Sequence, residues 1–94
     1  MVKVEEKSLE ERTRESQLSS LVEMTKRTLG DKGVGIVGSM GFIVVGGKKD
    51  IHVGLTTGTA LVTIDHPDDL GRGYALAEMY ETAIGKEVTL KKDY

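Results

Sequence analysis

Cysteine is absent from the 94 residues of the chain, and its absence excludes three kinds of chemistry. A chain without thiols forms no disulfide, binds no metal through thiolates and has no cysteine nucleophile. Tryptophan is absent as well, and Phe42 is the single phenylalanine beside three tyrosines. So few aromatic rings offer no visible platform on which nucleic-acid bases could stack.

An excess of charge of one sign is also missing. The 13 Lys and Arg residues are nearly balanced by 15 Asp and Glu, which gives a formal net charge of -2 and a pI near 5.7. A general nucleic-acid binder needs a basic surface that displaces counterions from phosphates. We therefore expect no nucleic-acid partner.

Long hydrophobic runs are lacking too. The longest uncharged stretch, residues 33–47, has fifteen residues of which six are glycine, whereas a membrane-spanning helix needs about 20 apolar residues. Residues 1–7 are charged and show no signal-peptide pattern. We expect a cytoplasmic protein that does not enter membranes.

The remaining composition is that of a small globular domain. Hydrophobic residues make up 38% of the chain and charged residues 30%, so residues 1–94 can form one domain with a modest core. Asparagine is absent and Gln17 is the only glutamine, a bias that is typical of proteins from hot environments.

Helical spacing dominates the first third of the chain. Ser8 and Glu11 fit a capping box, and an apolar stripe then continues to Leu29, so we expect a helix over about residues 9–29. Gly30 is the residue type that usually ends a helix in a left-handed conformation. Residues 1–12 offer almost nothing to a core, and we expect them to fray.

From residue 33 to residue 65 the hydrophobic period changes to two. Four strands are expected, over about 33–38, 41–46, 50–56 and 60–65, and the short connections make neighbouring strands antiparallel. A second helix should follow Pro67 and end at Gly85. Residues 86–94 either add a short edge strand or fray.

These elements predict an α+β fold: a helix, a four-stranded antiparallel meander and a second helix, with both helices on one face of the sheet. Alternation places Ile51, Val53 and Leu55 on one face and His52 and Gly54 on the other. Residues 42–45 are apolar on both sides, which predicts a central strand covered on both faces. A second copy of the chain is the expected cover of the helix-free face, so we predict a homodimer.

Two glycine motifs invite functional interpretations that their surroundings do not support. Residues 33–38 read G-x-G-x-x-G, but the motif follows a helix and enters a strand, the reverse of the dinucleotide-binding arrangement. Glycines there more simply allow close packing or a bulge. Residues 38–41 resemble a nucleophile elbow without its first glycine, and a hairpin turn explains them better.

Residues 65–69 form the densest group of potential metal ligands. Asp65, His66, Asp68 and Asp69 are weak candidates for holding a cation, and His52 could join His66 in a zinc site. A helix start explains the same residues without a metal, with Asp65 or His66 as cap and two carboxylates near the positive helix end. We expect no metal and no cofactor.

A speculative ligand-binding set combines cations with hydroxyls from the glycine-rich strands: Lys48, Lys49, Thr56, Thr57 and Arg72. These residues could hold an anionic metabolite or nucleotide. The simpler alternatives are that Lys48 and Lys49 protect a hairpin from aggregation and that Gly71 and Gly73, which flank Arg72, let the helix pack closely on the sheet.

Our leading hypothesis is a small non-enzymatic binding or adaptor module that acts as a homo-oligomer, with itself and another protein as partners. The alternative is a protein that binds or sequesters a small anionic ligand at the subunit interface. An enzyme that uses His52 or His66 with Asp65 is a third hypothesis, but no converging catalytic group supports it, and we expect no catalytic residues.

Overall fold

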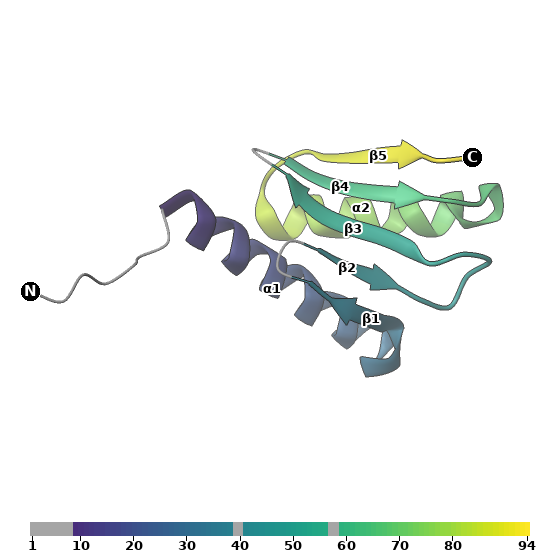
Figure 1. The fold of residues 1–94 in the computed structure, drawn as a ribbon, viewed down its shortest axis with the longest axis horizontal. Helices are drawn as coiled ribbons and strands as arrows, with labels where there is room; N and C mark the ends of the chain where they lie inside the picture. The colour runs from purple at the N-terminus through teal and green to yellow at the C-terminus, as the bar shows by residue number, and fades with distance from the viewer. Residues whose placement is uncertain (1–8, 39–40, 57–58) are drawn as a thin grey trace, which may run out of the picture.

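The computed structural model describes residues 9–38, 41–56 and 59–94, apart from the side chains of residues 9–12, 37 and 56. Its helices are α1 (Leu9–Leu29) and α2 (Leu70–Ile84), with the short 3-10 turns η1 (Asp31–Gly33) and η2 (Pro67–Asp69) beside them. Its strands are β1 (Val34–Val37), β2 (Gly41–Val44), β3 (Ile51–Thr56), β4 (Thr59–Ile64) and β5 (Val88–Lys92) (Figure 1). The fraying expected for residues 1–12 concerns positions that lie largely outside the described residues.

Glycines end both helices, as the sequence predicts. Gly30 has a φ of 85°, and its amide donates to the Lys26 carbonyl at 2.8 Å. Gly85 adopts the left-handed conformation with a φ of 66°, and its amide donates to the Glu81 carbonyl at 2.8 Å. A side chain would strain the backbone at either φ, so glycine is the residue that stops these helices.

The sheet has five strands in the order β1-β2-β3-β4-β5, and it is mixed. The meander from β1 to β4 is antiparallel, as expected, but β5 pairs with β4 in parallel, with Ala60 beside Val88 and Val62 beside Leu90. The four-stranded antiparallel meander is therefore only part of the sheet: of the two alternatives for residues 86–94, the edge strand is the one that forms, and it makes the sheet five-stranded and mixed. The cause is α2, which carries the chain back along the sheet so that the next strand runs in the same direction as β4.

Both helices pack on one face of this sheet and share one core with it. Leu18 and Leu21 from α1 join Leu76 and Tyr80 from α2 in a single cluster with alternate residues of β2 to β5. The Phe42 ring meets the Tyr80 ring edge to face, with centroids 6.3 Å apart and an interplanar angle of 76°. The sheet residues of the core are Phe42, Val44, Ile51, Val53, Leu55, Ala60, Val62, Ile64 and Val88.

The chain itself covers only one of the two faces of β2. Phe42 and Val44 are buried in the core, but Ile43 is only half-buried, and neither helix lies on its side of the sheet. The strand lies second from one edge, and the two helices available to the chain are both used on the opposite face. Within a single chain, β2 is therefore covered on one face only.

The glycine motif of residues 33–38 runs from η1 into β1, not from a strand into a helix. A side chain at Gly35 would collide with the Ile43 side chain, so β1 can approach β2 because glycine is there. The pairing of β1 with β2 also shifts between Val34 and Val37, which is the irregularity of a bulge. The motif thus shapes a strand edge and does not provide a phosphate-binding helix start.

Candidate functional site: the open face of the sheet

The face of the sheet opposite the helices consists mainly of small, aliphatic and hydroxyl residues. We call it the open face and define it by Ile36, Gly41, Ile43, His52, Gly54, Leu61 and Thr63. Two cross-strand rows build it: Gly41 lies beside Gly54 and Gly54 beside Leu61, while Ile43 lies beside His52 and His52 beside Thr63. The alternation of β3 and β4 therefore places these residues on one side, as the sequence predicts.

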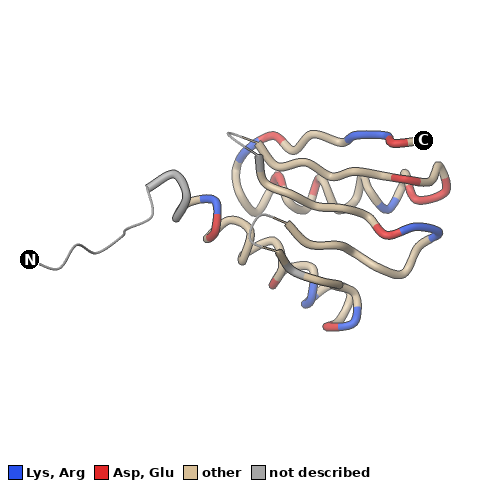
Figure 2. The backbone as a smooth tube through the Cα atoms, in the orientation of Figure 1, with Lys and Arg blue, Asp and Glu red and all other residues tan. Residues whose placement is uncertain are grey.

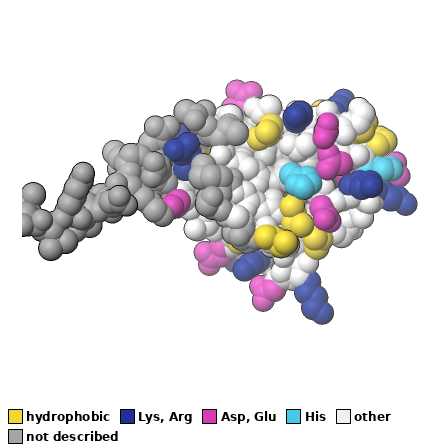
Figure 3. All heavy atoms as spheres, in the orientation of Figure 1, with side chains coloured by type: hydrophobic (Ala, Val, Ile, Leu, Met, Phe, Trp, Pro, Cys, Tyr) yellow, Lys and Arg dark blue, Asp and Glu magenta, His cyan; other side chains and the backbone are white. Residues whose placement is uncertain are grey.

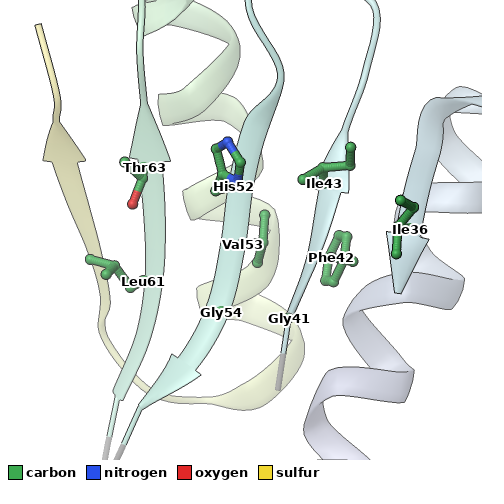
Figure 4. Close-up of a pocket in the computed structure, with 9 residues that line it drawn as sticks. All are labelled: Ile36, Gly41, Phe42, Ile43, His52, Val53, Gly54, Leu61 and Thr63. Carbon is green, nitrogen blue, oxygen red and sulfur yellow. The ribbon is translucent and has the colours of Figure 1, made fainter. Parts of the chain in front are cut away.

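A hollow of about 460 Å³ lies in the open face. Gly41 and Gly54, which line it, are register partners in β2 and β3, and a side chain at Gly41 would collide with the Val53 carbonyl, so this glycine lets the two strands approach closely. Ile36 and Ile43 border it on the β1 and β2 side, and Leu61 borders it on β4 (Figure 4). The described lining contains no Lys, Arg, Asp or Glu, so the hollow is suited to an apolar group.

Charged residues lie mainly around the open face. β1 to β4 contain no Lys, Arg, Asp or Glu, and the charged positions fall on helices, connections and β5 (Figure 2). In Figure 3, which views this face, white atoms separate groups of hydrophobic side chains, and most charged groups gather toward the margin. An apolar centre with a polar rim is the usual composition of a protein–protein contact surface.

Ile36 is the most exposed large hydrophobic residue that the structure describes, with 85% of its surface accessible. It lies in the irregular part of β1, between the two residues whose pairing with β2 is shifted. A bulge turns a side chain away from the direction that regular alternation would give. Two-residue alternation does not show a bulge, so the exposure of Ile36 could not be predicted from the sequence.

The structure brings His52 and Asp65 together beside the hollow. The His52 Nε2 atom lies 3.4 Å from the Asp65 Oδ2 atom, and the two side chains are 59% and 27% exposed. A carboxylate at this distance can orient an imidazole and balance its charge when it is protonated. His66 has a different place: its Nδ1 accepts a hydrogen bond from the Asp68 amide at 3.0 Å, which caps η2 as the sequence suggests.

Asp69 holds the connection between β2 and β3. The residue is only 4% exposed, and its Oδ1 and Oδ2 accept hydrogen bonds from the amides of Lys48 at 3.0 Å and Lys49 at 2.9 Å. The hydrogen bond from the Lys49 amide, followed by that from the Lys48 amide, lowers the pKa of Asp69 below its ordinary value. Burial acts in the opposite direction but is the smaller effect. The carboxylate therefore binds a loop 20 residues away in the sequence, in addition to lying near a helix start.

Arg72 completes the same arrangement from α2. Its Nη1 donates to the Val45 carbonyl at 2.8 Å and its Nη2 to the Lys49 carbonyl at 3.0 Å, while Nη2 lies 4.0 Å from Asp69 Oδ2. A side chain at Gly47 would collide with Arg72 and Asp69, so the loop can pass over them because of this glycine. We call these contacts of Asp69 and Arg72 with the loop the loop clamp.

The loop clamp gathers three of the residues proposed to bind a ligand, Lys48, Lys49 and Arg72, around a carboxylate of the chain itself. Thr56 ends β3, but its side chain and all of Thr57 lie outside the described residues. Among the residues that the structure describes, no group of three carboxylate or imidazole side chains is arranged to hold a metal ion. Of the weak metal candidates, Asp65 faces His52, while Asp69 faces the loop.

Gly71 and Gly73, which flank Arg72, have different surroundings. A side chain at Gly73 would collide with Ile64 of β4, so close packing of α2 on the sheet explains this glycine. At Gly71 an added carbon would meet nothing within 4 Å. The packing explanation is therefore confirmed for Gly73 and wrong for Gly71.

No helix in the described part of the chain is long and apolar enough to cross a membrane. Comparisons of the chain with protein-family models, curated proteins and solved structures find no match. The open face, with its hollow and its exposed Ile36, is the feature from which a function can be inferred.

Proposed function

We propose that the chain is a non-enzymatic binding module that associates with itself through the open face. The observation that carries this proposal is the combination of an exposed isoleucine and an apolar hollow whose described lining contains no Lys, Arg, Asp or Glu. Water solvates such a surface poorly, and contiguous apolar patches on small proteins usually mark contact sites. A second copy of the chain is the occupant that we propose.

The size of the face fits a small interface between two copies. Four strands at a spacing of about 4.8 Å make β1 to β4 about 19 Å wide. Six residues at a rise of about 3.3 Å each make β3 and β4 about 20 Å long. The projected area is thus roughly 400 Å², and two copies would bury roughly 1,000 Å² once side-chain relief is included. This is the lower limit of a specific interface, so we expect a dimer that dissociates in the micromolar range.

Charge also favours a second copy over a charged partner. The formal net charge of -2 is too small for strong repulsion between two chains. The hollow presents no cation to an acidic partner and no carboxylate to a basic one among its described lining residues. The His52–Asp65 pair at its border brings opposite charges with it when the imidazole is protonated.

Sedimentation equilibrium of the purified chain, from about 1 µM to about 1 mM, tests the proposal. We expect the mass to rise with concentration from 10.2 kDa to twice that value. Leu61→Lys, which places a charge in the open face, should keep the chain monomeric. Tyr74→Lys is the matched control, because Tyr74 is 52% exposed on α2, and it should leave the dimer intact.

A wild-type chain that stays at the monomer mass throughout would overturn the proposal, and so would a dimer that Leu61→Lys leaves unchanged. Native mass spectrometry of the chain purified from cells separates the proposal from the alternative of a small-ligand binder. We expect an integral multiple of the chain mass. An additional few hundred daltons that accompanies the monomer would instead support ligand binding.

A further inference from the structure

We propose that a second cavity, bordered by η1, the end of β2 and α2, binds a small organic anion. The cavity has a volume of about 350 Å³, within the range of sites that hold small ligands. Its described lining consists of Leu29, Lys32, Gly33, Val45, Gly46 and Arg72. It shares no described lining residue with the hollow in the open face, so this inference is independent of the proposed self-association.

The charge of the second cavity is positive. Its cations Lys32 and Arg72 come from η1 and α2, and no Asp or Glu is among the described lining residues. Asp31, the neighbour of Lys32, and Asp69, which lies 4.0 Å from Arg72 Nη2, both lie outside this lining. Two cations at a concave surface attract an anion, because low-dielectric walls concentrate their field.

Both cations keep hydrogen-bond donors for a ligand. Arg72 uses its Nη1 and Nη2 atoms for one carbonyl each, at Val45 and Lys49, whereas a guanidinium group has five N–H donors. A Cβ atom at Gly46 would lie 3.9 Å from Arg72 Nη1, so this end of the guanidinium borders the same space as the Gly46 backbone. The Lys32 side chain forms no ion pair or hydrogen bond with any residue that the structure describes.

Leu29 gives the second cavity an apolar wall. It is the last residue of α1, and it is 44% exposed. Val45, half-buried directly after β2, adds a second aliphatic side chain to the lining. An apolar group that covers Leu29 removes hydrocarbon from water, which is favourable. The cavity therefore suits a carboxylate or phosphate that is attached to an apolar group better than it suits an inorganic ion.

This site differs from the one that the sequence suggests. Of the five residues proposed there to hold an anion, only Arg72 is among the described lining of the second cavity. The amides of Lys48 and Lys49 are bound to Asp69. The second cation is Lys32, which follows α1 and has no basic or glycine motif that links it to Arg72 in the sequence.

Phenyl phosphate, which joins a phosphate to an aromatic ring, is the probe, and a nuclear magnetic resonance titration of the isotopically labelled chain locates it. We expect saturable shifts of the Gly33 and Gly46 amides, with a dissociation constant of about 1 mM or lower, the range of so small a ligand. The amides of Gly54 and Leu61 on the open face should not shift. Inorganic phosphate should bind at least about threefold more weakly, because it does not cover Leu29.

Two variants separate the charged and apolar parts of the site. Lys32→Met removes the charge and keeps a long side chain, so it should raise the dissociation constant for phenyl phosphate at least about threefold. Lys86→Met is the matched control, because it removes the same charge from an exposed lysine between α2 and β5, and it should change the constant by less than about 1.5-fold. Leu29→Ala should weaken phenyl phosphate at least about twofold and leave inorganic phosphate unchanged. Arg72 stays unchanged because it also holds the loop.

Three results would overturn the inference. The first is the absence of saturable shifts at Gly33 and Gly46 up to about 10 mM phenyl phosphate. The second is a set of shifts confined to Gly54 and Leu61, which would place the probe on the open face. The third is equal binding by Lys32→Met and Lys86→Met. None of these results changes the mass of the chain in solution, so the self-association is tested separately by sedimentation.

Discussion

The hydrogen bond between Tyr80 and Thr25 allows a quantitative test of how the two helices are joined. Tyr80 has 0% exposure, and its hydroxyl lies 2.7 Å from the Thr25 Oγ1 atom. The Thr25 hydroxyl has one proton, which it donates to the Leu21 carbonyl at 2.7 Å. Tyr80 is therefore the donor in the bond between the helices, and Thr25 is the acceptor.

The direction of this bond makes the two single substitutions unequal. Tyr80→Phe removes a donor and leaves Thr25 with its bond to Leu21, so it should lower the free energy of unfolding by about 1 kcal/mol. Thr25→Val leaves the Tyr80 hydroxyl buried without an acceptor, which should lower it by about 2–3 kcal/mol. The double variant replaces both groups with apolar ones of similar shape and should cost about 1 kcal/mol, which is less than the sum.

Urea unfolding followed by far-ultraviolet circular dichroism measures these differences without relying on tyrosine fluorescence. The slope of the free energy against urea should be the same in all four proteins, so that their midpoints can be compared directly. Equal losses for Tyr80→Phe and Thr25→Val would refute the assigned donor. A double variant that loses the full sum of the single losses would show that the two hydroxyls do not interact.

Alkaline pH tests the burial of Tyr80 independently. Burial raises the pKa of Tyr80 to about 12. Since the pKa is higher in the folded chain, this contribution is complete below about pH 10, the unfolded value, and is lost as pH rises toward 12. Wild type should lose about 2–3 kcal/mol more than Tyr80→Phe over this interval; parallel pH profiles would contradict the burial.

Two further predictions concern α2 and the loop clamp. Gly71→Ala should raise the free energy of unfolding by up to about 1 kcal/mol, whereas Gly73→Ala should lower it by about 1–3 kcal/mol because the methyl group collides with Ile64. Urea unfolding of both variants measures the two changes. Equal changes would contradict the difference in packing between the two glycines. Asp69→Asn should lower the melting temperature by several degrees at pH 7. It should also flatten the decline in stability in acid, because the pKa of Asp69 is lowered in the folded chain. The stability that the carboxylate contributes is present above about pH 4 and is lost as the carboxylate is protonated. Melting temperatures from pH 2 to 7 that run parallel in the two proteins would show that the carboxylate does not act through its charge.

Local signals in the sequence predicted the elements that local physics determines. The helix over residues 9–29 has the bounds of α1, and Gly30 and Gly85 end the helices because of their positive φ values. The alternation in β3 and β4 identified both faces of the sheet, including the place of His52 on the open one. These features depend on neighbouring residues, so a sequence shows them.

Contacts between distant residues could not be predicted in the same way. Residues 86–94 alternate as an edge strand would, but the parallel direction of β5 follows from the path of α2 across the sheet. Asp69 has the sequence context of a helix-start carboxylate, and nothing near it indicates that its partners are the amides of Lys48 and Lys49. The two lysines and Arg72 therefore resemble an anion-binding set in the sequence, although the lysine amides bind the Asp69 carboxylate and Arg72 lies beside it.

The loop clamp also explains how the open face receives its composition. Residues 42–45 are all apolar, so the hydrophobic pattern of β2 does not by itself determine which side faces the core, and a slip of one residue would exchange the two sides. Arg72 binds the Val45 carbonyl directly after β2, and Asp69 binds the amides that precede β3. By fixing both ends of this connection, the clamp keeps Gly41 opposite Gly54 and Ile43 on the open face. The charged residues behind the sheet therefore maintain the register on which the apolar hollow depends.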